Sequence, residues 1–101
     1  ITIDDVKCFE GADAASGDLT RFHLFSYDFT NGSTSCLSNG TLLARTGIDV
    51  NNAGSEQAYL TTLTIDSANV ASGKVVLAFF ESDSINSDYS LSINIKYHVT
   101  G

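Results

Sequence analysis

The sequence predicts an all-β fold, a single antiparallel β-sandwich of the jelly-roll type with about seven to eight strands. One long stretch alternates between apolar and polar residues, and several shorter stretches are rich in β-branched and aromatic residues. Clusters of Gly, Asn, Asp and Ser separate these stretches, and none of the stretches has a helical period. The chain of 101 residues suffices for one core, so we expect one domain that covers residues 1–101.

In the first half of the chain the strand signals vary in strength. Residues 1–8 alternate weakly and predict an edge strand. Residues 19–27 carry apolar side chains at both even and odd positions, which predicts a strand with apolar groups on both sides. Two shorter candidates follow at residues 41–45 and 48–50.

The second half gives clearer signals. Residues 58–65 predict a strand, and residues 66–73 predict either one short helical turn or a plain loop. Residues 74–80 are almost continuously apolar, which is typical of a strand buried on both faces. Residues 89–99 alternate along their whole length, which predicts a strand with one buried and one wet face. Because residues 81–88 are polar and rich in turn formers, the last two strands are expected to form an antiparallel hairpin.

The charge and composition exclude several classes of partner. The net charge is −7, so a nucleic-acid backbone or an anionic membrane surface would be repelled. No apolar run approaches the length needed to cross a bilayer, and we expect no membrane insertion by this domain. The chain contains no Met, so we expect it to be a processed or excised product whose original start is not visible.

Two cysteines, Cys8 and Cys36, are too few for a thiolate zinc site and lack Cys-x-x-Cys spacing. In an oxidising compartment they are candidates for a single disulfide, which would stabilise the fold by roughly 3–4 kcal/mol. The alternative is two buried free thiols.

No pattern in the sequence assembles a catalytic site, and we expect the chain not to be an enzyme. The Gly-x-Ser-x-Gly turn of serine hydrolases is absent. Of the two histidines, His98 falls on the polar face of the last strand, and His23 lies among apolar neighbours as a half-buried packing residue. A glycosidase needs two carboxylates in a cleft, and a domain of this size has little room for one.

Calcium is the one cofactor for which the sequence supplies abundant hard oxygen ligands. Acidic residues gather at Asp4 and Asp5, in residues 10–18 and in residues 81–88. None of these stretches has the spacing of an EF-hand loop, so exposed carboxylates without a metal are the default interpretation.

The stretch "SNGTLLARTG" contains a turn signal and a modification signal. Asn39 and Gly40 tolerate the positive φ of a tight hairpin turn, so we expect a turn there. Asn39 and Asn31 also begin Asn-x-Ser/Thr sequons, which make both residues glycosylation candidates if the chain passes through a eukaryotic secretory pathway.

Four segments in order, "FHLFSYD", "SNGTLLARTG", "NAGSEQAYLTTLTI" and "SGKVVLAFFESDSINSDYSLSINI", resemble the bacterial pre-peptidase C-terminal domain. In that family a Tyr-Asp pair, here Tyr27 and Asp28, ends a strand that leads to an "NGTLLA" strand, and a "YSL" motif opens the last strand. The resemblance covers about residues 19–97. The chain departs from the family's pattern in its extra residues 31–38 and in Lys74 to Val76, which replace the usual "GTYYV" start.

The resemblance implies a secreted or cell-surface, non-catalytic accessory domain beside an extracellular hydrolase, with roles in maturation, stability or substrate association. Its partner would be the catalytic domain of the parent chain. One alternative is a structural subunit of a surface filament or adhesin, in which residues 1–6 add a strand to a like subunit. Another is a carbohydrate-binding module with exposed aromatic residues, for which Phe9 and Phe29 are the candidates, although burial under a loop is the more common outcome.

Overall fold

The computed structural model describes residues 1–13, 17–33, 38–47, 50–51, 56–83 and 87–100, and it confirms an all-β antiparallel sandwich. These residues contain no helix. They form eight strands: β1 Thr2–Asp13, β2 Leu19–Asp28, β3 Thr41–Arg45, β4 Val50–Asn51, β5 Glu56–Thr62, β6 Thr64–Ile65, β7 Lys74–Ser82 and β8 Asp88–His98.

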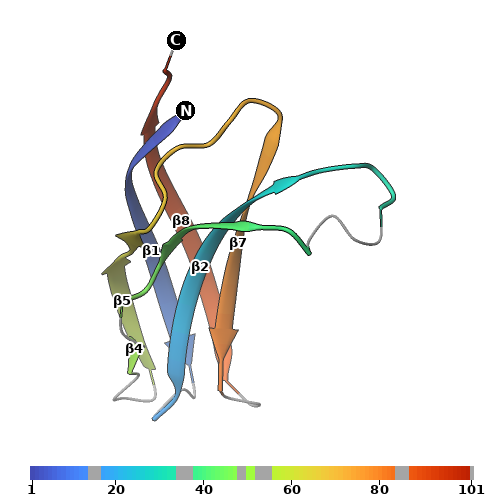
Figure 1. Cartoon of the computed structure of the whole chain (residues 1–101). Helices are drawn as coiled ribbons and strands as arrows, with labels where there is room; N and C mark the ends of the chain where they lie inside the picture. The colour runs from blue at the N-terminus through green and yellow to red at the C-terminus, as the bar shows by residue number, and fades with distance from the viewer. Residues whose placement is uncertain (14–16, 34–37, 48–49, 52–55, 84–86, 101) are drawn as a thin grey trace.

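The strands build two sheets that pack face to face (Figure 1). The first sheet has the order β5-β1-β8, so β1 is its central strand. In the second sheet β2 is central: β7 pairs with one side of it, β3 and β4 pair with the other, and β6 lies beyond β3. The long strands β7 and β8 are therefore edge strands of different sheets.

A β-bulge at Asp4 sets which side chains of β1 face the core. Ile3 pairs with Tyr97 and Asp5 pairs with Lys96, so Asp4 is the extra residue. The bulge lets both Ile3 and Val6, three positions apart, point inward, and the alternation then continues through Cys8. This one-residue insertion weakens the period-two signal at the start of the chain.

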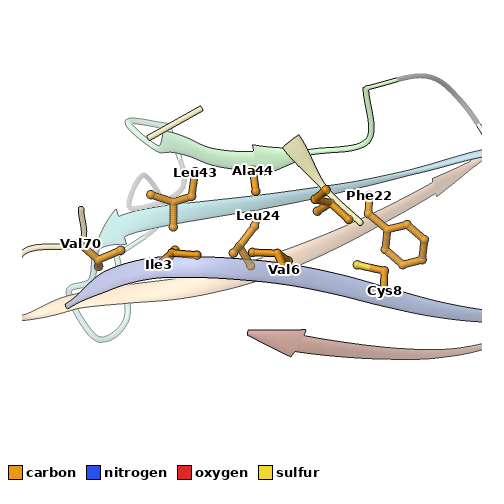
Figure 2. Close-up of a cluster of buried hydrophobic side chains, with 9 residues drawn as sticks. Ile3, Val6, Cys8, Phe22, Leu24, Leu43, Ala44 and Val70 are labelled. Carbon is orange, nitrogen blue, oxygen red and sulfur yellow. The ribbon is translucent and has the colours of Figure 1, made fainter. Parts of the chain in front are cut away.

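The core lies between the two sheets and draws on both central strands (Figure 2). Val6, Cys8, Leu24 and Leu43 are fully inaccessible to solvent. A second bulge at Leu43, between the pairs Leu24–Ala44 and Phe25–Leu42, lets Leu43 and its neighbour Ala44 both be buried. The full set of buried apolar core residues is Ile3, Val6, Cys8, Phe22, Leu24, Leu43, Ala44, Leu63 and Val70.

Three expectations about the strands prove wrong. Residues 1–8 are not an edge strand, because they begin β1, which pairs with β8 on one side and, from Lys7 onward, with β5 on the other. Before Lys7 the second side is bonded to the 63–70 segment, as in the hydrogen bond from the Ile3 N–H to the Ala68 carbonyl. The last two strands do not form a hairpin, since β7 pairs with β2 and β8 pairs with β1. The strand expected at residues 58–65 is split at Leu63, where the chain passes from the first sheet to the second.

Other local expectations are confirmed. The strands expected at residues 19–27, 41–45, 74–80 and 89–99 are present as β2, β3, β7 and β8, with bounds that differ by at most a few residues. Residues 66–73 form a loop, with one isolated bridge between Asn69 and Thr2. In the candidate strand at residues 48–50, only Val50 lies within the described part of the chain, in β4.

Candidate interaction surfaces

The described thiol and imidazole groups lie on different faces of the sandwich and do not form a nucleophile–base pair. Cys8 points into the core between the sheets (Figure 2). His23 projects from the outer face of the second sheet, half-buried, with its ring centroid 6.1 Å from that of Phe25. His98 is exposed at the end of β8, where its Nδ1 lies 2.9 Å from the carboxylate of Asp4. The half-buried position expected for His23 and the wet face expected for His98 are confirmed.

Cys8 is a free thiol at a fully buried position. Desolvation by this burial raises the pKa of the Cys8 thiol to about 11, because the charged thiolate cannot be hydrated there. The other half of the predicted disulfide, Cys36, lies outside the described residues. The bridge stays a prediction, and it would have to form inside the core.

Most described carboxylates in the stretches proposed for calcium already have protein partners. Asp5 pairs with Lys7, and Asp83 accepts a hydrogen bond of 2.9 Å from the backbone N–H of Leu19. Asp18 accepts a hydrogen bond of 3.1 Å from the Tyr89 hydroxyl. Within the described part of the chain, no group of three or more His, Cys, Asp or Glu residues could hold a metal ion.

Glu10 differs from these carboxylates because it faces the interior. It is only 2% exposed, and neither of its carboxyl oxygens has a hydrogen-bond partner in the described structure. Thr20 on β2 is also buried, and its hydroxyl is likewise unpartnered. A buried polar group without a partner costs stability, so Glu10 is a destabilising buried group and not an exposed loop ligand.

The outer face of the second sheet carries an apolar patch, which we call the outer aromatic face. The inward positions of β2 and β7 are set by core residues such as Phe22 and Phe80, so their sequence neighbours project outward. Cross-strand pairing places His23 opposite Phe79 and Phe25 opposite Leu77. The patch consists of His23, Phe25, Tyr27, Leu42, Val75, Leu77 and Phe79.

The rings of the outer aromatic face pack against one another. Phe25 stacks on Tyr27, with centroids 5.9 Å apart and an interplanar angle of 26°. Phe79 meets Phe25 edge to face at 5.8 Å and remains 37% exposed. Tyr27 is buried beneath Gly40: a Cβ on residue 40 would lie 2.8 Å from the Tyr27 Cζ. Glycine is therefore needed at position 40 for close packing, and not for the positive φ expected of the turn, which Gly40 does not adopt.

A second apolar surface lies where the edge strands β7 and β8 face each other across the sandwich, and we call it the β7–β8 seam. It consists of Ala78 and Phe80 from β7 and of Leu91 and Ile93 from β8, which all face inward. These four residues line a groove of about 180 Å³ together with Phe22 and neighbouring residues. Leu91 is 45% exposed although it lies on the inward side of its sheet. The sandwich is thus incompletely closed along this side.

The sequence interpretation missed both surfaces. The continuous apolar run of residues 74–80 predicts burial on both faces, and this is wrong for Phe79, which is 37% exposed because the described residues place no second layer over the outer face of β7. The candidates for exposure, Phe9 and Phe29, are indeed exposed, at 44% and 58%. The sequon residues Asn31 and Asn39 are exposed too, each in or next to a turn.

Comparison with protein-family models, curated proteins and solved structures found no significant match. The described part of the chain contains no helix long and apolar enough to cross a membrane. Fold and surfaces together define the class: an antiparallel β-sandwich whose distinctive features are apolar surfaces.

Proposed function

We propose that the chain is a secreted, non-catalytic accessory domain of an extracellular hydrolase and that it contacts its parent protein through the outer aromatic face. The observation that carries the proposal is the position of half-buried Phe25 and Leu77 and exposed Phe79 on a sheet face over which the described residues place no second layer. Apolar patches of this kind on a soluble domain are typical of protein contacts. The order of motifs shared with the pre-peptidase C-terminal domain supports the same role.

The ring geometry favours a protein partner over a carbohydrate. A sugar-binding platform presents ring faces to solvent, so that a pyranose can lie flat on them. Here one face of Tyr27 is covered at Gly40, and Phe25 and Tyr27 stack on each other. Only the edges and parts of the faces of these rings stay accessible to a partner, and such a surface suits the irregular side chains of a protein.

The test begins with the coding sequence on both sides of this segment. We expect a hydrolase catalytic domain in the same reading frame, and its absence would contradict the accessory role. The complete chain is then produced with Phe79→Asp and, as a matched control, with Leu60→Asp on the outer face of the other sheet, where Leu60 is 56% exposed. We expect Phe79→Asp alone to lower the yield of folded secreted enzyme. Equal yields from the two variants would exclude the outer aromatic face as the contact.

The same material tests the carbohydrate alternative. A pull-down with insoluble polysaccharides should recover none of the isolated domain if its partner is protein. Retention that Phe79→Asp abolishes would replace the accessory role with glycan binding.

A second candidate, a subunit of a surface filament or adhesin, is favoured by the edges of β7 and β8 that the described strands leave unpaired. Its donor strand would not be residues 1–6, because they already pair with β8 of their own chain and bond to the 63–70 segment on the other side. Long polymers of the purified chain in electron microscopy would support this candidate, and a closed small oligomer would count against it.

A further inference from the structure

The outer edge of β8 is the longest unpaired strand edge in the described structure. β8 runs over Asp88–His98 and pairs with β1 on one side only. Natural proteins protect such edges with prolines, bulges or inward-pointing charges. The chain contains no proline, and the inward positions of β8 hold Tyr89, Leu91, Ile93, Ile95 and Tyr97.

We infer that two copies of this chain pair along β8, antiparallel and about a two-fold axis at Ile93. The six strands β5-β1-β8 of one copy and β8-β1-β5 of the other then form one continuous sheet. This inference is independent of the accessory role, since the two copies meet along the edge of β8, whereas the outer aromatic face lies on the far side of the second sheet. Of that face, only Phe79 also lines the groove of the seam.

The sequence of β8 is complementary to itself in this register. When Ile93 faces its own copy, Leu91 faces Ile95 and Tyr89 faces Tyr97, so every apolar inward residue meets another. On the outward side Ser90 faces Lys96 and Asp88 faces His98. No pair of like charges is opposed along the full length of the strand. A shift by one residue would set the apolar face of one copy against the polar face of the other.

The same axis also closes the β7–β8 seam. A two-fold axis between antiparallel neighbouring strands is perpendicular to the sheet, so the second sheets of both copies lie on the same side. The groove of about 180 Å³ in each copy, with Leu91 and Phe80 in its wall, then faces its equivalent. Apolar groups that one copy leaves half-exposed become interior groups of a larger sandwich.

The chain exposes more surface than is usual for a folded chain of its size. A folded chain of 10.7 kDa is expected to expose about 5,500 Å², whereas this one exposes 6196 Å². This excess of roughly 700 Å² belongs to the whole surface of the chain, and it leaves room for the ~800 Å² that each partner buries in a standard interface. The radius of gyration of 15.0 Å also exceeds the ~13 Å expected for this length.

The charge of the chain distinguishes a second copy from a basic partner. Each copy carries −7, so two copies repel each other at low ionic strength. Added salt screens the repulsion and should strengthen the dimer, whereas a contact with a cationic peptide would weaken.

Sedimentation equilibrium of the purified chain, from low micromolar to near-millimolar concentration and at low and high salt, tests the inference. We expect a monomer–dimer equilibrium that shifts toward dimer with salt. Leu91→Lys should raise the dissociation constant of the dimer by roughly thirtyfold or more, since the substitution puts a charge at the centre of each half of the interface. Leu60→Lys, at a comparably exposed position on β5 at the far edge of the same sheet, is the control and should leave it unchanged.

The other outcomes overturn the inference. A monomer at every concentration excludes the dimer, and a dimer that tolerates Leu91→Lys places the contact elsewhere. Growth into open polymers excludes closed two-fold pairing. Circular dichroism checks that Leu91→Lys is folded, and if it is not, Tyr97→Lys at a 55% exposed position replaces it. Loss of the dimer would leave the Phe79→Asp test unaffected, so the two proposals fail separately.

Discussion

Burial of the Cys8 thiol predicts a specific loss of stability at alkaline pH. In the unfolded chain the thiol releases its proton near its ordinary pKa of 9.0, whereas the folded state raises that pKa to about 11. Between these values the folded state binds more protons than the unfolded state, so the free energy of unfolding falls as the pH rises. A difference of about two pKa units corresponds to ~3 kcal/mol in total, of which ~2 kcal/mol is lost between about pH 8 and about pH 10.5.

The measurement compares the wild-type chain with Cys8→Ala by urea unfolding in the presence of a reductant. All other ionisable groups are the same in both proteins, so the difference between the two unfolding free energies isolates Cys8. We expect wild type to be more stable by about 1–2 kcal/mol near pH 8, as for loss of a small buried group. That advantage should vanish or reverse by about pH 10.5.

If the difference in unfolding free energy between wild type and Cys8→Ala stayed constant with pH in the presence of reductant, the reasoning would be refuted, because the thiol would then not be buried in the folded state. Repeating the series without reductant tests the predicted disulfide. A Cys8–Cys36 bridge removes the titrating thiol, so the wild type would then lose this pH dependence.

Further predictions concern packing, the buried carboxyl group and metal binding. Gly40→Ala should destabilise the fold by about 1–3 kcal/mol through overlap with the Tyr27 ring. Gly11→Ala is the control and should be neutral or stabilising in the same urea titration, because its Cβ would meet nothing closer than 3.7 Å. If both substitutions changed the unfolding free energy by the same amount, the overlap between residue 40 and the Tyr27 ring would have to be relieved in the folded state. Glu10→Met should raise the unfolding free energy by about 1–3 kcal/mol by removing an unpartnered buried group, and a loss would mean that the carboxyl group has a partner. The melting temperature should be the same in excess calcium and in chelator, and a rise of several degrees in calcium would reveal a site.

The sequence predicts individual strands well but not their partners. The period-two run of β8 depends on local burial alone, so its bounds can be found from the chain itself. Pairing depends on contacts between distant segments. Both β7 and β8 therefore look like halves of a hairpin, although they belong to different sheets. The central position of β1 was missed because the bulge at Asp4 interrupts its alternation.

Two residues of β1 also make its contribution to the core hard to predict from the sequence. Phe9 is apolar and points outward, while Glu10 is charged and points inward, so the usual relation between polarity and burial is reversed there. The interaction surfaces were missed for a related reason. An apolar residue in a strand predicts burial, and only the sheet order shows that Phe79 and Leu91 lie where no further layer or strand covers them.

Amide hydrogen exchange along β8, measured at a low and a high protein concentration, tests most directly whether this strand edge is an interaction surface. We predict that alternate amides of β8, whose N–H groups point away from β1, exchange quickly in dilute solution and become protected at high concentration. The amides of residues 7–13 in β1 should be protected at both concentrations, because this part of the strand is paired on both sides, by β5 and by β8. Exchange along β8 that does not depend on concentration would contradict the account.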